Sequence, residues 1–149
     1  MEQQRQLIKI LLVEDDDGHA RLIERHLRKM NPATPIDRVR DGLEALDYLR
    51  NLGSYADRSR YPRPHMVLLD INMPRMDGIE LLEHLKRDDQ LRCLPVIMLT
   101  STDNQTEVDR CYCAGASGYV AKPVNIVGLG EKLQRLGSFL EIVELPEVA

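Results

Sequence analysis

Acidic residues follow two apolar runs of the chain directly. The run 8–13 ends in the four acids 14–17, and the run 66–69 ends in Asp70. Carboxylates that converge on one point repel one another unless a cation lies among them, and Mg²⁺ prefers such hard oxygen ligands. The sequence therefore predicts a Mg²⁺ site at these run ends. Its predicted ligands are the carboxylates of Glu14, Asp15 and Asp70 and the backbone carbonyl of Asn72.

Two further run ends, together with Asp70, point to a phosphoryl group as the second ligand. A carboxylate beside bound Mg²⁺ can act as a nucleophile and form an aspartyl phosphate, and Asp70 is the best candidate because it directly follows a strongly apolar run. Lys122, after the run 118–121, would place a positive charge on the transferred oxygens. Thr100, at the end of the run 95–100, would donate a hydrogen bond from its hydroxyl to the same group.

Five short apolar runs alternate with segments of helical period, and this order determines how the polar residues meet. The predicted strands are 8–13, 35–39, 66–69, 95–100 and 118–121. The runs 8–13, 66–69 and 95–100 are nearly continuous in Val, Ile and Leu, which indicates strands that are covered on both faces. The alternating run 35–39 indicates an edge strand. Strands that alternate with helices predict a parallel α/β sheet with helices on both faces. Ligands of such sheets bind beyond the carboxyl ends of the strands, where all of these polar residues lie.

Composition places the chain among single globular domains. Its 149 residues match one domain, predicted as 1–149 with a core over 8–136 and a C-terminal extension over 137–149. A net charge of −4 argues against a nucleic-acid binder, and no apolar run is long enough to span a membrane. Three cysteines and a start without an apolar leader predict a reduced, cytoplasmic protein. The cysteines are expected to be inert thiols, and the four histidines are expected to lie at the surface.

Four segments together resemble the receiver domain of bacterial response regulators. They are Leu-Val-Glu-Asp at 12–15, Leu-Asp-Ile-Asn-Met-Pro-Arg-Met-Asp-Gly at 69–78, Leu-Thr-Ser at 99–101 and Gly-Ala-Ser-Gly-Tyr-Val-Ala-Lys-Pro at 115–123. The resemblance covers roughly residues 8–136. It implies a flavodoxin-like five-stranded sheet of order 2-1-3-4-5 with five helices. Chemotaxis response regulators have the same strand order.

The same resemblance implies a signalling role. Asp70 would accept a phosphoryl group from the phosphohistidine of a sensor histidine kinase, with Mg²⁺ required. Thr100 and Tyr119 would couple that event to the surface of the fourth helix, fifth strand and fifth helix, although the direction of the Tyr119 ring stays open. The bond between Lys122 and Pro123 would be cis. The chain would then be a phosphoacceptor rather than an enzyme, with at most slow loss of its own phosphoryl group.

Two variable segments resemble single-domain regulators that are paired with phytochromes, the red-light-sensing histidine kinases. These segments are the long loop 51–64 and the tail 137–146. Such regulators tend to form homodimers through the C-terminal part of the domain, which implies dimer contacts at Phe139, Leu140 and Val143. The spacing of the apolar residues also predicts that the last helix continues past Gly137, and the tail could instead pack on its own domain. No output domain is expected to follow.

Two other functions stay open at this point. A phosphorylation-independent adaptor with a vestigial pocket is disfavoured because Glu14, Asp15, Asp70, Thr100 and Lys122 are all present. An aspartyl-phosphate phosphohydrolase of the haloacid dehalogenase type needs a second Asp two residues after the nucleophile, where this chain has Asn72. Asp16 and Asp17 are expected to be a helix cap and a surface residue.

Overall fold

The computed structural model describes residues 7–101, 104–122 and 126–147. The strands are β1 (Ile10–Val13), β2 (Ile36–Val39), β3 (Met66–Leu69), β4 (Val96–Thr100) and β5 (Gly118–Ala121). The helices are α1 (Asp17–Met30), α2 (Gly42–Arg50), α3 (Gly78–Arg87), α4 (Gln105–Ala114) and α5 (Ile126–Ile142), with a short 3-10 turn η1 (Gly53–Tyr55). All neighbouring strands pair in parallel in the order β2-β1-β3-β4-β5, which confirms the predicted fold and places β2 at an edge.

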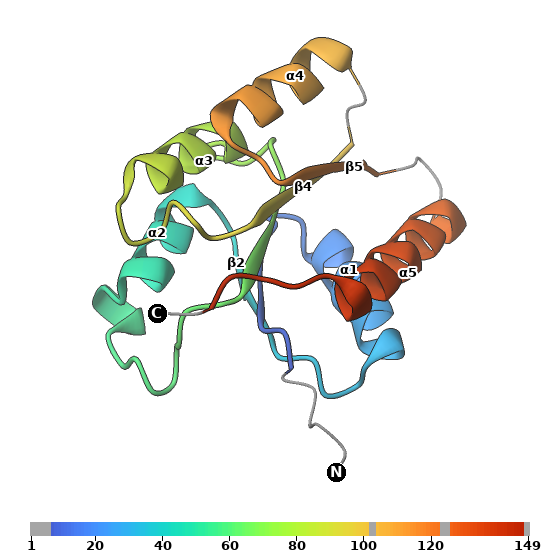
Figure 1. The fold of residues 1–149 in the computed structure, drawn as a ribbon, viewed down its shortest axis with the longest axis horizontal. Coiled ribbons are helices and arrows are strands. Elements are labelled where there is room, and N and C mark those ends of the chain that lie inside the picture. The colour runs from blue at the N-terminus through green and yellow to red at the C-terminus, as the bar shows by residue number, and fades with distance from the viewer. Residues whose placement is uncertain (1–6, 102–103, 123–125, 148–149) are drawn as a thin grey trace.

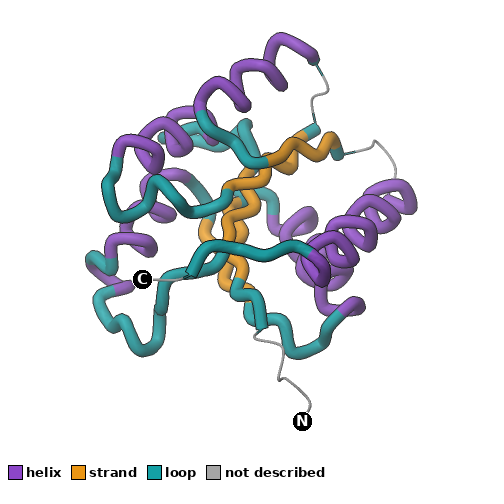
Figure 2. The backbone as a smooth tube through the Cα atoms, viewed as in Figure 1, coloured by secondary structure: helices purple, strands orange, loops and turns teal. Residues whose placement is uncertain are grey.

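The sheet is the middle layer of three. Helices α1 and α5 cover one face, and α2, α3 and α4 cover the other (Figure 1; the strands are orange in Figure 2). Alternate residues of each central strand supply the two cores: Leu11 and Val13 point toward the α2–α4 layer, and Ile10 and Leu12 toward α1 and α5. Every residue of β1, β3 and β4 is buried, as the continuous apolar runs predict.

Acidic caps begin the three helices that follow β1, β2 and β3. Asp16 accepts a hydrogen bond from the backbone of His19, Asp41 from that of Glu44, and Asp77 from that of Glu80. Each cap satisfies a backbone N–H group that a helix start leaves without a partner. The caps fix where each helix begins and therefore where each loop at the carboxyl edge of the sheet must end.

The long loop after α2 packs on the domain instead of projecting from it. Its Tyr55 and Tyr61 rings contact each other and the buried Tyr48, with centroids 4.9 to 5.7 Å apart. The Tyr48 hydroxyl donates to Asp37 at 2.5 Å, and the Tyr55 hydroxyl donates to Glu44 at 2.6 Å. This segment is therefore an ordered part of the α2 side of the molecule.

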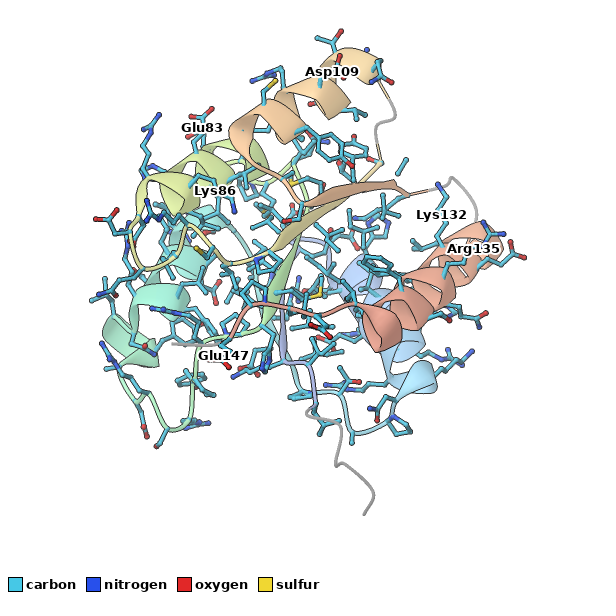
Figure 3. The ribbon with its side chains drawn as sticks, viewed as in Figure 1. Glu83, Lys86, Asp109, Lys132, Arg135 and Glu147 are labelled. Carbon is cyan, nitrogen blue, oxygen red and sulfur yellow. The ribbon has the colours of Figure 1, made fainter. Side chains whose placement is uncertain are left out.

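The last helix does continue past Gly137, and the tail that follows runs back across the domain (Figure 1). Leu140 is buried in the α1–α5 core, Val143 packs against that core, and Phe139 is half exposed. Glu147, labelled in Figure 3, lies with Arg63 and Pro95 in the wall of a cavity of about 470 Å³ at the amino end of the sheet.

Among the described helices, none combines the length and the apolar character that crossing a membrane requires.

Candidate functional site

The ends of β1 and β3 bring the predicted acidic residues together. Val13 pairs with Leu69, and the backbone N–H of Asp70 donates to the Val13 carbonyl at 3.2 Å, so the next residue of each strand lies at one place. Ligand oxygens of Glu14, Asp15 and Asp70 all lie within 4.8 Å of one another. Glu14 and Asp70 are buried, and Asp15 is the more exposed member.

This arrangement fits a hard divalent cation. Three carboxylates at such short range offer the oxygen ligands that Mg²⁺ and similar ions take, and they leave positions open for water and a phosphoryl oxygen. Asn72 lies in the loop that follows Asp70, and its backbone N–H donates to Oδ1 of Asp70 at 3.3 Å. The acidic triad can therefore bind a divalent metal ion, as the run ends predict.

Lys122 lies between two of these carboxylates. Its Nζ is 2.7 Å from Oε2 of Glu14 and 3.5 Å from Oδ2 of Asp70, and all three side chains are at most 10% exposed. Burial raises the pKa of Glu14 above its usual value, the hydrogen bond and charge of Lys122 lower it, and the charge of Asp70 raises it again. In this structure the lysine is thus held mainly by Glu14, with Asp70 close by.

Thr100 ends β4 beside this group. The residue is fully buried, and its Oγ1 has no hydrogen-bond partner among the described residues. The backbone N–H of Lys122 donates to the Thr100 carbonyl at 2.7 Å, so the two residues are joined through the main chain. A buried hydroxyl without a partner is costly, which marks this position as one that awaits an acceptor.

Side chains from β2 and α5 hold the loops that carry these groups. Arg38, on the edge strand β2, donates from Nε to the Glu14 carbonyl at 2.9 Å and from Nη1 to Asp17 at 2.6 Å. The Arg38 hydrogen bond is the largest cause of the lowered pKa of Asp17. On the other side, Lys132 of α5 reaches the end of β5 and donates to the Ala121 carbonyl at 2.7 Å (Figure 3).

Gly78 supports the loop that begins at Asp70. Its backbone N–H donates to the Ile71 carbonyl at 2.9 Å, and a Cβ atom here would lie 2.2 Å from the Asp70 carbonyl oxygen. Only glycine permits the start of α3 to approach the phosphoacceptor candidate so closely. This explains why the segment 69–78 ends in Asp-Gly.

The remaining predicted residues have different surroundings. Tyr119 is half buried on β5 and packs against the core on the α2–α4 side of the sheet, which settles the direction that the sequence left open. Pro123 lies outside the described residues, and so does the bond that was expected to be cis.

The prediction that all four histidines are surface residues is wrong for two of them. His65 is half buried and accepts a hydrogen bond from the backbone of Lys9 at 2.9 Å. His26, on α1, is also half buried and lies against Gly130 of α5, with its Nδ1 buried. Of the cysteines, Cys111 is buried, and Cys93 and Cys113 are exposed.

Sequence reasoning missed two arginines near the site: Arg38, which donates to the Glu14 carbonyl, and Arg75, which donates to Asp41. The signal for Arg38 was a basic residue next to Asp37 in the middle of the alternating edge strand 36–39. The signal for Arg75 was an arginine within the loop between Asp70 and the helix cap Asp77. Neither signal identifies the partner, because both arginines bind residues that are distant in the sequence.

Comparison with known proteins gives a consistent result. The family profile of the response regulator receiver domain matches residues 10–134. The probable methanogenesis regulatory protein FilR2 of Methanothrix harundinacea is 38% identical over 130 residues, which cover 87% of this chain and 81% of that protein. The response regulator Rcp1 of Synechocystis is 36% identical over 138 residues, 92% of each chain.

Solved structures agree with these sequence matches. The phosphorylated cyanobacterial phytochrome response regulator RcpA superposes with a TM-score of 0.88 at 34% identity, covering 95% of this chain and all of that one. The Mn²⁺-bound form of Rcp1 gives a TM-score of 0.86 at 35% identity and covers 94% of this chain and 99% of that one.

Proposed function

The chain belongs to the response regulator receiver domain family, and on that premise we propose that Asp70 accepts a phosphoryl group from the phosphohistidine of a sensor histidine kinase. Receiver domains are phosphoacceptors of two-component signalling rather than catalytic enzymes. The observation that carries the proposal is the grouping of Asp70 at one edge of the sheet with two further carboxylates, Lys122 and the Thr100 hydroxyl, which has no partner within the described part of the chain.

Each group has a role in the transfer. Glu14, Asp15, Asp70 and the Asn72 carbonyl would hold Mg²⁺, which supplies positive charge to the oxygens of the transferred group. A carboxylate oxygen of Asp70 attacks phosphorus while the phosphorus–nitrogen bond to the kinase histidine breaks, and the imidazole nitrogen leaves with the bonding electron pair. Lys122 offsets the charge that accumulates on the acceptor side.

The product then changes the contacts of Thr100 and Lys122. A phosphoryl group brings a charge of about −1.5 to −2 and three strong acceptor oxygens. The Thr100 hydroxyl gains its missing acceptor, and Lys122 gains a stronger partner than Glu14. Movement of these two residues is transmitted to Tyr119 and the α4-β5-α5 surface, where partners bind the phosphorylated form.

Intact mass spectrometry tests the acceptor directly. The chain is incubated with Mg²⁺ and acetyl phosphate beside the variants Asp70→Asn and Asp77→Asn, the second being a matched control because Asn caps a helix as well as Asp does. We expect one added phosphoryl unit in the wild type and in Asp77→Asn, and none in Asp70→Asn or without Mg²⁺. No adduct under any condition, with phosphate turnover also excluded, would favour the phosphorylation-independent adaptor instead.

The kinase partner is proposed to be a phytochrome. This rests on the relatives Rcp1 and RcpA, the second of which is described as a phytochrome response regulator. A phosphorylated phytochrome-type kinase should transfer its phosphoryl group to the chain at least about tenfold faster than a kinase of another sensor class at equal concentration, a preference of about 1.4 kcal/mol. Equal rates would remove the phytochrome assignment and leave Asp70 as acceptor.

We also propose that the chain forms a homodimer through the C-terminal end of α5. Leu140 and Val143 already pack on their own domain, so Phe139, half exposed beside them, is the central contact. Phe139→Asp should shift the dimer to monomer in light scattering, whereas Leu52→Asp should not, although both side chains are 50% exposed. A monomeric wild type, with and without acetyl phosphate, would contradict this part of the proposal.

A further inference from the structure

The loop between β3 and α3 is held at a second point besides Gly78. Arg75 lies in the middle of this loop with a φ of 66°, in the left-handed region that residues other than glycine avoid. Its Nε and Nη2 both donate to Oδ2 of Asp41, at 2.8 and 2.5 Å. The Arg75 side chain is 59% exposed and that of Asp41 only 6%, so an arginine at the surface meets a buried carboxylate.

Asp41 uses its other oxygen for a different task. Its Oδ1 accepts the hydrogen bond from the Glu44 backbone that caps α2, at 3.0 Å. One buried carboxylate therefore joins the start of α2 to the loop that follows Asp70. A strained backbone conformation persists where the surrounding contacts fix it, and the two hydrogen bonds to Asp41 provide that restraint for Arg75.

A backbone contact beside this pair runs between the same two elements. The N–H of Gly42 donates to the Met76 carbonyl at 3.4 Å, and a Cβ at Gly42 would lie 2.7 Å from the Met76 side chain. The start of α2 and the loop thus touch through neighbouring residues, with no room for a side chain between them. Displacement of Arg75 would carry Met76 with it.

We propose that Asp41 and Arg75 are positioning residues for the phosphoryl-transfer site. The inference rests on the function proposed above and extends it to residues that contact neither metal nor phosphoryl group. Asn72 lies three residues before Arg75, and its N–H and carbonyl serve the Asp70 carboxylate and the proposed Mg²⁺ site. By fixing the loop, the Asp41–Arg75 pair sets where Asn72 lies.

The experiment measures Mg²⁺ affinity by calorimetry and the initial rate of phosphorylation by acetyl phosphate. Both are measured at a temperature well below the midpoint of thermal unfolding of every variant. Asp41→Asn keeps a residue that caps α2 but removes the charge. Arg75→Gly removes the guanidinium while easing the left-handed backbone, so this variant is not expected to unfold. Arg87→Ala is the matched control, because Arg87 is an exposed arginine paired with Glu83 at 3.8 Å on the outer surface of α3 (Figure 3 labels Glu83).

We expect Asp41→Asn and Arg75→Gly each to weaken Mg²⁺ binding about tenfold, which is the usual effect of changing a residue that orients metal ligands without binding the metal. Both variants should also slow phosphorylation at a fixed low Mg²⁺ concentration. The double variant should be no weaker than either single one, because both remove the same interaction. Arg75→Lys should restore part of the affinity, and Arg87→Ala should match the wild type.

Two outcomes would overturn the inference in different ways. Wild-type affinity and rate in both Asp41→Asn and Arg75→Gly would remove the positioning role and leave the proposed function intact. A wild-type chain that neither binds Mg²⁺ nor takes up a phosphoryl group would remove the proposed function and the positioning role together.

Discussion

The two halves of the site differ in how their functional groups are satisfied. The acidic half, Glu14, Asp15 and Asp70 at the ends of β1 and β3, has partners for its buried carboxylates and support for its loops. The switch half, Thr100 and Lys122 at the ends of β4 and β5, holds a buried hydroxyl without a partner among the described residues.

The difference corresponds to two tasks. A metal ion binds best to ligands that are already in place, so the acidic half is supported from β2 and α2. A switch needs groups that gain a partner in only one state, because a ligand shifts an equilibrium only by its differential affinity for the two states. The Thr100 hydroxyl, which finds no acceptor in the ranges that the structure describes, and the contact of Lys122 with Glu14 give the switch half that property. Four changes test the contrast, in order of decreasing effect.

Lys122→Ala should have the largest effect because it affects both halves. Removing one partner of a buried ion pair typically costs about 3–5 kcal/mol, and here it leaves Glu14 without its cation. Denaturant unfolding should show that loss without Mg²⁺, and Mg²⁺ should recover more stability in the variant than in the wild type. We expect metal binding to survive and signalling to be uncoupled, so normal partner binding by the phosphorylated variant would contradict the role of Lys122.

Gly78→Ala should disturb the acidic half alone. The added methyl group would lie 2.2 Å from the Asp70 carbonyl oxygen, and such overpacking typically costs about 1–3 kcal/mol. Gly118→Ala is the control in the switch half, since its methyl group would meet Ile97 at an ordinary 3.6 Å. The free energy of unfolding, measured in urea, and the phosphorylation rate should both fall for Gly78→Ala and change little for Gly118→Ala. Similar losses in both would mean that the two halves are equally tight.

Thr100→Val should slightly stabilise the unphosphorylated chain. Valine has the same shape without the hydroxyl, and removing a buried donor without a partner should raise the free energy of unfolding by about 1 kcal/mol. The same variant should bind partners of the phosphorylated form more weakly. A clear loss of stability in thermal unfolding would show that the hydroxyl is already paired, and the contrast between the halves would disappear.

The smallest effect concerns pH and the acidic half. Burial raises the pKa of Glu14, so the folded chain holds this proton more tightly than the unfolded chain. The stability that this proton contributes is present below the usual pKa of 4.5 and is lost as the pH rises through the raised value. Mg²⁺ needs the ionised carboxylate, so its affinity should weaken as the pH falls through the same window. Calorimetry at several pH values should show this slope in the wild type and a flatter one in Glu14→Gln.

The sequence predicted the groups that the backbone alone places, and these form most of the site. Glu14, Asp70, Thr100 and Lys122 each follow or end a strand, and parallel strands deliver their ends to one edge whatever the side chains do. The direction of the Tyr119 side chain was not predictable in this way. Side chains of a strand alternate between the two helix layers, and the run 118–121 carries no pattern that shows which residues face which layer.

The supporting side chains could not be predicted for a related reason. Arg75 meets Asp41 across 34 positions of the sequence, and Arg38 meets the Glu14 carbonyl across 24. Such pairs depend on how far neighbouring loops lie from each other after packing, and periodicity does not encode that distance. The buried edges of His26 and His65 were missed because an isolated histidine reads as a surface residue until a neighbour covers it.

The packing of Leu136 and Leu140 has a practical consequence for truncation. The family match ends at residue 134, within α5, yet both leucines beyond it are buried in the core that α1 and α5 share. A chain cut at 134 would lose two side chains that cover the sheet, at about 1.5–3 kcal/mol for each. Fusions and shortened versions of this domain should therefore keep every residue through at least Val143, and the domain boundary follows the helix instead of the family match.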